Sequence, residues 1–387
     1  MLIATDCLAS TGLAGVSGLA VSVVLLLLVG VPLVVWSRKM TSKGAAVIAL
    51  LLVVGMTGMW TSQEQSAFAV TDCSASPSAS PSPTTPTSSP TPTPLSIVFT
   101  NQTTATGLGS NVVRGVTVVA GQIYASTANG FSISSNGGTS YLNNWTFDGL
   151  GSNTTTGSAV SGSYIYIATT GGLSISTNGG NNFFNKSTSS GLGSNTVNGV
   201  AISGSTIYAA TAAGLSISTN GGTSFTNYTT ANGLGSNTVN SVAVAGSTIY
   251  AATAAGLSIS TNGGSSFTNF TTAIGLGSNN ITAVTVEASV IYVSTSAGLS
   301  ISTDGGTSFT NYTTANGLGS NSVNGVALLG GYICAATNGG LSISTDGGTT
   351  FTNFTTADGL GSNTVNGVSV SGTTIYAATS GGLSLGN

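Results

Sequence analysis

Apolar and polar positions follow three different patterns along this chain of 387 residues. Residues 13–36 and 44–60 are long apolar runs, residues 74–94 contain no apolar side chain larger than alanine, and the remainder consists of short apolar segments separated by glycine and asparagine. Short alternating segments bounded by turn residues are typical of β-strands, and no helical period occurs beyond the two long runs. We therefore expect an all-β domain that follows an N-terminal region of a different kind.

The alternating part is one unit repeated seven times. The sequence Gly-Leu-Gly-Ser-Asn begins at residues 107, 149, 191, 233, 275, 317 and 359, so every spacing is 42 residues. In the third unit we expect strands at 197–202, 206–210, 215–218 and 224–229, with glycine and asparagine in the turns that need positive φ. Four strands in a unit of about 40–45 residues are typical of a β-propeller blade.

The two ends of the chain predict that the ring is closed. The seventh unit stops after three strands, and its missing fourth strand begins near Ser96, where residues 99–101 match 309–311 in register. Residues 94–387 make up seven units of 42 with none left over. An open stack would need capping repeats, whereas a closed ring leaves no exposed edges. We predict a seven-bladed β-propeller with four-stranded blades of 42 residues, whose N-terminal strand closes the last blade.

The two apolar runs near the N-terminus allow two interpretations. They contain 24 and 17 residues, and three of the five basic residues of the chain lie between them, at 38–43. Both runs cross the membrane as transmembrane helices with this basic loop in the cytoplasm, or Met40 is the true start and residues 40–69 are a signal peptide that ends in Ala67-Phe68-Ala69. In the second interpretation 1–39 is a misassigned start. Both interpretations place the rest of the chain outside the cytoplasm.

Residues 70–93 form a linker rich in proline, serine and threonine. Seven of the eight prolines of the chain fall between residues 77 and 94. Such a segment cannot bury a core, and repeated proline favours an extended, semi-rigid spacer. We expect a disordered linker that holds the propeller away from the bilayer.

Two known repeat families resemble residues 94–387. Residues 302–309, Ser-Thr-Asp-Gly-Gly-Thr-Ser-Phe, resemble the Asp-box or bacterial neuraminidase (BNR) repeat, and residues 344–351 match it equally well. The order Gly-Leu-Gly-Ser-Asn, then Tyr-Ala-Ala-Thr, then Gly-Leu resembles the propeller repeat of two-component regulators. The Asp-box resemblance implies that the acidic residue bonds the turn between the last two strands, and asparagine, which stands there in four units, can serve similarly. These structural turn positions are Asn136, Asn178, Asn220, Asn262, Asp304 and Asp346.

The composition argues against catalysis, metal binding and nucleic-acid binding. Only 3% of the residues are charged, the net charge is −3, and histidine is absent. General acid–base catalysis and zinc sites therefore lack their usual residues, and five basic residues cannot neutralise a run of phosphates. We expect no catalytic residues, no metal, no cofactor and no nucleic-acid partner. Sialidases with Asp-boxes use three arginines and a Tyr–Glu pair, whereas residues 94–387 contain a single arginine, Arg114, and a single glutamate, Glu287.

Positions that break the repeat, or that recur within it, are the candidates for specific contacts. Four residues depart from an otherwise uniform array and are candidate partner contacts: Arg114, Trp145, Asp148 and Lys186. Sequons for N-glycosylation recur in the expected outer strand, where they are either glycan acceptors or polar residues that solvate the strand. They begin at Asn101, Asn144, Asn185, Asn227, Asn269, Asn311 and Asn353.

The sequence as a whole predicts a protein of the cell envelope, membrane-anchored or secreted, with its propeller on the extracytoplasmic side. The expected function is non-catalytic: adhesion, scaffolding or the binding of a glycan or protein partner at the cell surface, with the membrane contacted through the N-terminal segment. The alternative is a ligand-sensing propeller of a signalling system, for which only residues 1–12 or 37–44 remain as a cytoplasmic output. A sialidase-like glycosidase ranks third, because a glycosidase needs two neighbouring carboxylates.

Overall fold

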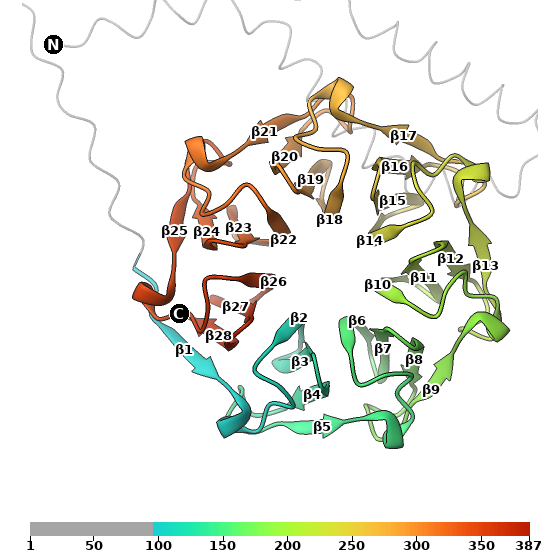
Figure 1. The fold of residues 1–387 in the computed structure, drawn as a ribbon, viewed down its shortest axis with the longest axis horizontal. Helices are drawn as coiled ribbons and strands as arrows, with labels where there is room; N and C mark the ends of the chain where they lie inside the picture. Colours follow the sequence, from blue (N-terminus) through green and yellow to red (C-terminus); the bar gives the residue numbers. More distant parts are fainter. Residues whose placement is uncertain (1–95) are drawn as a thin grey trace, which may run out of the picture. The chain divides into compact units, whose positions relative to one another are not determined.

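The computed structural model describes residues 96–387, which form a ring of seven antiparallel four-stranded sheets (Figure 1). The predicted all-β, seven-bladed propeller is thereby confirmed. The predicted transmembrane helices or signal peptide at 1–69, and the linker at 70–93, lie outside the described residues. Among the residues described, no helix combines the length and the apolar character of a membrane span.

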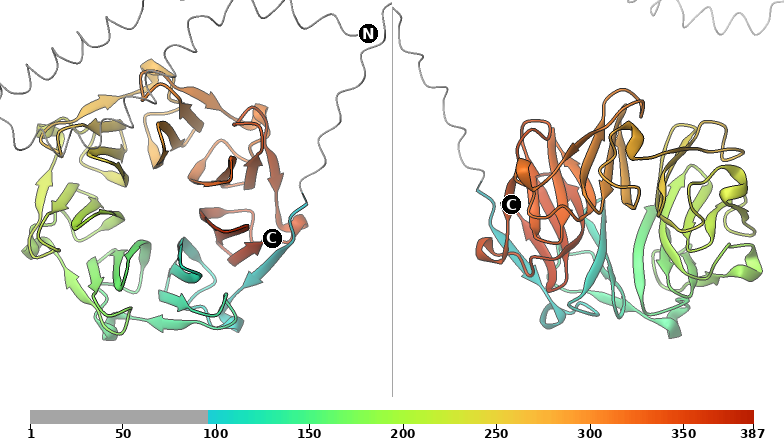
Figure 2. Two further views of the ribbon diagram at one scale, coloured as in Figure 1. Left: turned by 180° about the vertical axis from the view of Figure 1, so that it is seen from behind. Right: turned by 45° about the horizontal axis from the view of Figure 1, so that its top comes forward.

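Each blade runs from the centre of the ring to its rim in chain order, except that the outer strand of the seventh blade is the first strand of the chain (Figures 1 and 2). The innermost strands are β2 (Val113–Val119), β6 (Thr155–Ser161), β10 (Val197–Ser203), β14 (Val239–Ala245), β18 (Ile281–Glu287), β22 (Val323–Leu329) and β26 (Val365–Ser371). The second strands are β3 (Gln122–Thr127), β7 (Tyr164–Thr169), β11 (Thr206–Thr211), β15 (Thr248–Thr253), β19 (Val290–Thr295), β23 (Tyr332–Thr337) and β27 (Thr374–Thr379). The third strands are β4 (Gly130–Ser134), β8 (Gly172–Ser176), β12 (Gly214–Ser218), β16 (Gly256–Ser260), β20 (Gly298–Ser302), β24 (Gly340–Ser344) and β28 (Gly382–Gly386). The outer strands are β5 (Leu142–Asn144), β9 (Phe184–Lys186), β13 (Thr226–Tyr228), β17 (Thr268–Phe270), β21 (Thr310–Tyr312), β25 (Thr352–Phe354) and β1 (Phe99–Gln102).

The ring closes between the first and last strands. β1 pairs antiparallel with β28, with Phe99 opposite Gly386 and Gln102 opposite Leu383. The Phe99 side chain is 7% exposed and makes an edge-to-face contact with Phe354 of the neighbouring blade, at 5.9 Å between ring centroids. The strand near the N-terminus therefore completes the seventh blade, as the repeat arithmetic predicts.

The hydrophobic core lies between the blades. One cluster joins Tyr166 and Leu173 of the second blade to Val197, Ile207 and Phe225 of the third, and similar clusters follow around the ring. Because each sheet buries its apolar side chains against the next sheet, no blade has a complete core of its own. This interdependence is why closure matters to stability.

A short 3₁₀ helix that the sequence analysis did not predict follows each outer strand: η1 (Thr104–Thr106), η2 (Thr146–Asp148), η3 (Thr188–Ser190), η4 (Thr230–Asn232), η5 (Thr272–Ile274), η6 (Thr314–Asn316) and η7 (Thr356–Asp358). In the third blade the Thr229 hydroxyl caps η4 by accepting from the Ala231 amide. The helix ends at Gly233, whose φ of 94° is in the left-handed region that glycine tolerates. The outer strand is therefore shorter than the predicted 224–229, and Gly-Leu-Gly-Ser-Asn is a structural connection between blades.

Candidate functional site

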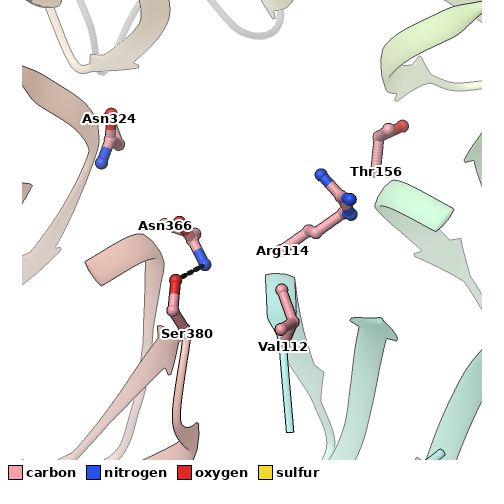
Figure 3. Close-up of a pocket in the computed structure, with 6 residues that line it drawn as sticks. All are labelled: Val112, Arg114, Thr156, Asn324, Asn366 and Ser380. Carbon is pink, nitrogen blue, oxygen red and sulfur yellow. Dashed lines mark hydrogen bonds between the residues drawn. The ribbon is translucent and has the colours of Figure 1, made fainter. Parts of the chain in front are cut away.

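A cavity of about 410 Å³ opens where the innermost strands begin, and we call it the channel-mouth cavity (Figure 3). It is lined by Val112, Arg114, Thr156, Asn324, Asn366 and Ser380. These residues come from four consecutive blades of the ring, the sixth, seventh, first and second. The lining is polar, and Arg114 is its one charged side chain.

The second residue of each innermost strand joins its blade to the next one, with Arg114 as the exception. In six blades this side chain donates a hydrogen bond to the carbonyl oxygen of the first residue of the next innermost strand, at 2.5–2.9 Å. The six pairs are Thr156 with Val197, Asn198 with Val239, Asn240 with Ile281, Thr282 with Val323, Asn324 with Val365, and Asn366 with Val113. Arg114 occupies the seventh position and forms no hydrogen bond with any residue in the described range 96–387.

A different residue replaces the missing bond at the junction of the first two blades. Thr155 is fully buried, and its Oγ1 accepts from the Thr127 amide at 2.7 Å. The same hydroxyl lies 3.1 Å from the carbonyl oxygens of Thr127 and Gly130, to either of which it donates. The other six blades carry valine or isoleucine here, which form no such bonds. This junction is thus held without Arg114, whose guanidinium is left exposed at the cavity.

The other three residues that break the repeat do not line this cavity. The Trp145 amide donates to Asp148 Oδ2 at 2.8 Å, so Asp148 caps η2. The Trp145 ring stacks on Phe147 at 5.3 Å, and Phe147 is 79% exposed. Lys186 ends β9 on the rim, opposite Leu173. Of the four candidate contacts, only Arg114 belongs to the channel-mouth cavity.

The predicted turn positions all hold the turn between the third and outer strands. Asp304 accepts from the Ser308 hydroxyl at 2.6 Å, the Ser308 amide at 3.0 Å and the Ser302 hydroxyl at 2.7 Å. These bonds hold the pKa of Asp304 well below its usual value, and the bond from the Ser308 hydroxyl has the largest effect. The Thr350 amide similarly lowers the pKa of Asp346. Asparagine makes the equivalent bonds in the other turns, at Asn136, Asn178, Asn220 and Asn262.

The asparagines of the recurring sequons take part in a hydrogen-bond network, which we call the serine–asparagine network. In the third blade, the fully buried Ser216 accepts from the Gly193 amide at 3.0 Å and donates to Asn227 Oδ1 at 2.9 Å. Asn227 Nδ2 then donates to the Ala213 carbonyl oxygen at 2.9 Å. The other members are Asn101, Asn143, Asn185, Asn269, Asn311 and Asn353.

Asn144 is displaced from this network, because Asn143 takes its position in the first blade. The Asn144 side chain is 4% exposed, and its buried Nδ2 has no partner among the described residues. In each sequon the amide nitrogen that would carry a glycan is therefore either hydrogen-bonded within the fold or buried.

Three further side chains of types that can take part in catalysis are Cys334, Asp358 and Glu287. Cys334 is completely buried, and burial raises the pKa of its thiol to about 12. Asp358 accepts from the Thr355 amide at 2.8 Å and so caps η7. Glu287 is exposed at the end of β18. Within 96–387 no three His, Cys, Asp or Glu side chains come together as a metal site would require.

The fold is shared with several solved structures, although no protein-family model and no curated protein matches the sequence. The extracellular domain of a hybrid two-component system from B. thetaiotaomicron has a TM-score of 0.64 at 18% identity, over 75% of this chain and 42% of that one. The extracellular domain of a one-component system from the same organism has a TM-score of 0.61 at 19% identity, over 74% and 39%. YCF48 from Cyanidioschyzon merolae has a TM-score of 0.55 at 15% identity, over 75% and 98%. The chain spans about two fifths of the first two structures, and at these identities the similarity establishes the fold alone.

Proposed function

We propose that this chain is a non-catalytic propeller, displayed outside the cytoplasm, that binds a glycan or protein partner at the cell surface in adhesion or scaffolding. The observation that carries the proposal is the channel-mouth cavity. Arg114 alone among seven equivalent side chains is not used to join blades, and it faces a polar cavity of the size of small-molecule sites. Because Arg114 makes no bond between blades, its guanidinium is available to bind a ligand.

A non-catalytic role is supported by what the acidic residues do. Asp304 and Asp346 hold turns, and Asp148 and Asp358 cap 3₁₀ helices. Glu287 is the one other acidic residue of 96–387, and its strand β18 carries no second carboxylate. Glycosidases need an acid and a base or nucleophile within about 5–10 Å of each other across the substrate.

Display outside the cytoplasm is supported by the sequence and by the shared fold. We place residues 1–69 in the membrane or in a cleaved signal peptide, and residues 70–93 in a spacer that carries the propeller. We assign the repeats of the propeller to the Asp-box type. Two of the similar solved structures are extracellular domains. The same likeness favours a second candidate function, a ligand-sensing propeller that passes a signal to a membrane partner.

We also propose that the sequon asparagines stabilise the ring and carry no glycans. A sugar on Asn227 Nδ2, which donates to Ala213, would have to fit between Gly193 and Gly214, where even a Cβ atom would lie 2.6–2.7 Å from this nitrogen. Peptide mass spectrometry of the protein from its natural source is expected to find these asparagines unmodified. A glycan on Asn227 in folded protein would contradict this assignment.

Display and binding are tested separately. An epitope tag at Asn387 is expected to react with antibody on intact cells, while a cytoplasmic marker reacts only after lysis. The detergent-solubilised full chain is then applied to a glycan array and to a cell-surface extract, with heat-unfolded chain as the control. Retention of a glycan or surface protein by the native chain alone supports the proposal. A tag reached only after lysis, or no native-specific retention, contradicts it. Copurification with a membrane protein that has a cytoplasmic signalling domain would favour the sensor.

A further inference from the structure

The geometry points to a small hydroxylated monocarboxylate as the ligand of the channel-mouth cavity, with its carboxylate on Arg114 and its hydroxyl groups on Asn324 and Asn366. This inference rests on the proposed binding function and specifies the chemical class of one ligand.

The cation in the cavity has no anionic partner among the described residues, and so it is free to bind one from a ligand. Arg114 and Lys186 are the two basic residues of 96–387, and no acidic residue lines the cavity. The guanidinium presents its donors in a planar fork that matches the two oxygens of a carboxylate. Because Thr155 holds the junction between the first two blades, Arg114 can turn toward a ligand without weakening the ring.

Opposite Arg114 the cavity offers hydrogen-bond acceptors. Asn324 Nδ2 donates to the Val365 carbonyl oxygen and to Asn338 Oδ1, each at 2.8 Å. Asn366 Nδ2 donates to the Val113 carbonyl oxygen at 2.7 Å and to Ser380 Oγ at 3.3 Å (Figure 3). Both hydrogens of each amide group are thus used within the protein, and the Oδ1 atoms are left as acceptors with no donor among the described residues.

This pairing of one cation with two acceptors selects among anions. An Oδ1 atom attracts a hydroxyl group of a ligand and repels an oxygen of an ionised group. A phosphate dianion, which brings acceptor oxygens on every side and a second negative charge, therefore fits less well than a carboxylate whose far end carries hydroxyl groups. The volume of about 410 Å³ is at the small end of ligand cavities, which suits a molecule of the size of a monosaccharide.

Matched ligands test the inference on the full chain in mild detergent. Isothermal titration is carried out with D-galacturonate, D-gluconate and L-lactate, with D-galactose as the neutral match of galacturonate, and with inorganic phosphate. We expect galacturonate or gluconate to bind at least about tenfold more tightly than galactose and phosphate. Lactate, which has a single hydroxyl group, should bind more weakly than either. The binding should weaken as sodium chloride is raised, because one ion pair contributes to it.

Two variants locate the binding. Arg114→Gln is expected to lower the affinity for the preferred carboxylate at least about tenfold, whereas Lys186→Gln, which removes the rim cation, leaves it unchanged. Unaltered circular dichroism and melting show that both variants are folded. Equal affinity of Arg114→Gln and wild type, or no binding of any carboxylate in the panel, would overturn the inference. If no carboxylate of the panel binds while a neutral glycan or surface protein binds wild type and Arg114→Gln equally, the inference is overturned and the proposed binding function stays in place.

Discussion

Replacing Phe99 by alanine tests whether the N-terminal strand contributes to the ring as fully as an outer strand that belongs to an unbroken blade. Phe99 and Phe267 occupy equivalent positions of the repeat, and each is 7% exposed. Each also makes an edge-to-face aromatic contact, Phe99 with Phe354 at 5.9 Å and Phe267 with Tyr228 at 6.5 Å. Removing a buried phenylalanine side chain lowers the free energy of unfolding by about 3–5 kcal/mol. In a closed ring the two alanine variants should therefore lose similar amounts, within about 1 kcal/mol of each other.

The measurement is urea-induced unfolding followed by circular dichroism, with the slope of each transition compared so that a change in cooperativity is recognised. Val98→Ala is the control, because Val98 is 70% exposed and its truncation should change the free energy of unfolding by at most about 0.5 kcal/mol. If Phe99→Ala resembles this control while Phe267→Ala has the full effect, β1 is not closing the ring and the reasoning is refuted.

Two further predictions concern the networks that hold the blades. Ser216→Ala leaves the partly buried Gly193 amide without its acceptor, so we expect the free energy of unfolding to fall by about 1–3 kcal/mol in the same titration. Exposed Thr226→Ala should change it little, and equal effects would argue against the serine–asparagine network. The lowered pKa values of Asp304 and Asp346 add stability that is present above the unfolded-state pKa of about 4 and is lost as pH falls through the folded-state values. Melting temperature should therefore be nearly constant from about pH 5 to 8 and drop below about pH 4. The double variant Asp304→Asn, Asp346→Asn should show a smaller acid drop, and an equally steep one would contradict this origin.

The architecture could be predicted from the sequence because its two determinants are linear. The 42-residue spacing and the match of residues 99–101 to the fourth strand are visible without any coordinates, and together they require a ring of seven blades. The 3₁₀ helices could not be predicted from periodicity, because three residues are too few to show a helical period. Their signals were present in the threonine caps and the following glycine, as at Thr229 and Gly233.

The candidate site was predictable only in part. Arg114 was noticeable as the single arginine of the propeller, but its partners in the cavity lie on other blades, and Asn324 and Asn366 follow the common repeat. Nothing in the sequence marks Thr155, because a change from valine to threonine is conservative in a strand. Its importance depends on carbonyl groups of the preceding blade, which only the packing of the two blades brings near.

The most direct test of the account is to melt wild type and Arg114→Asn with and without the carboxylate that binds wild type more tightly, D-galacturonate or D-gluconate. Asparagine at this position can donate to the Thr155 carbonyl oxygen as Asn198 does to Val239, so the unliganded variant should be more stable by about 0.5–1.5 kcal/mol. This ligand should raise the melting temperature of wild type by an amount that grows with its concentration, and it should leave that of the variant unchanged. A variant that melts at or below wild type, or a ligand that raises both melting temperatures equally, would contradict the claim that Arg114 is released from the ring in order to bind.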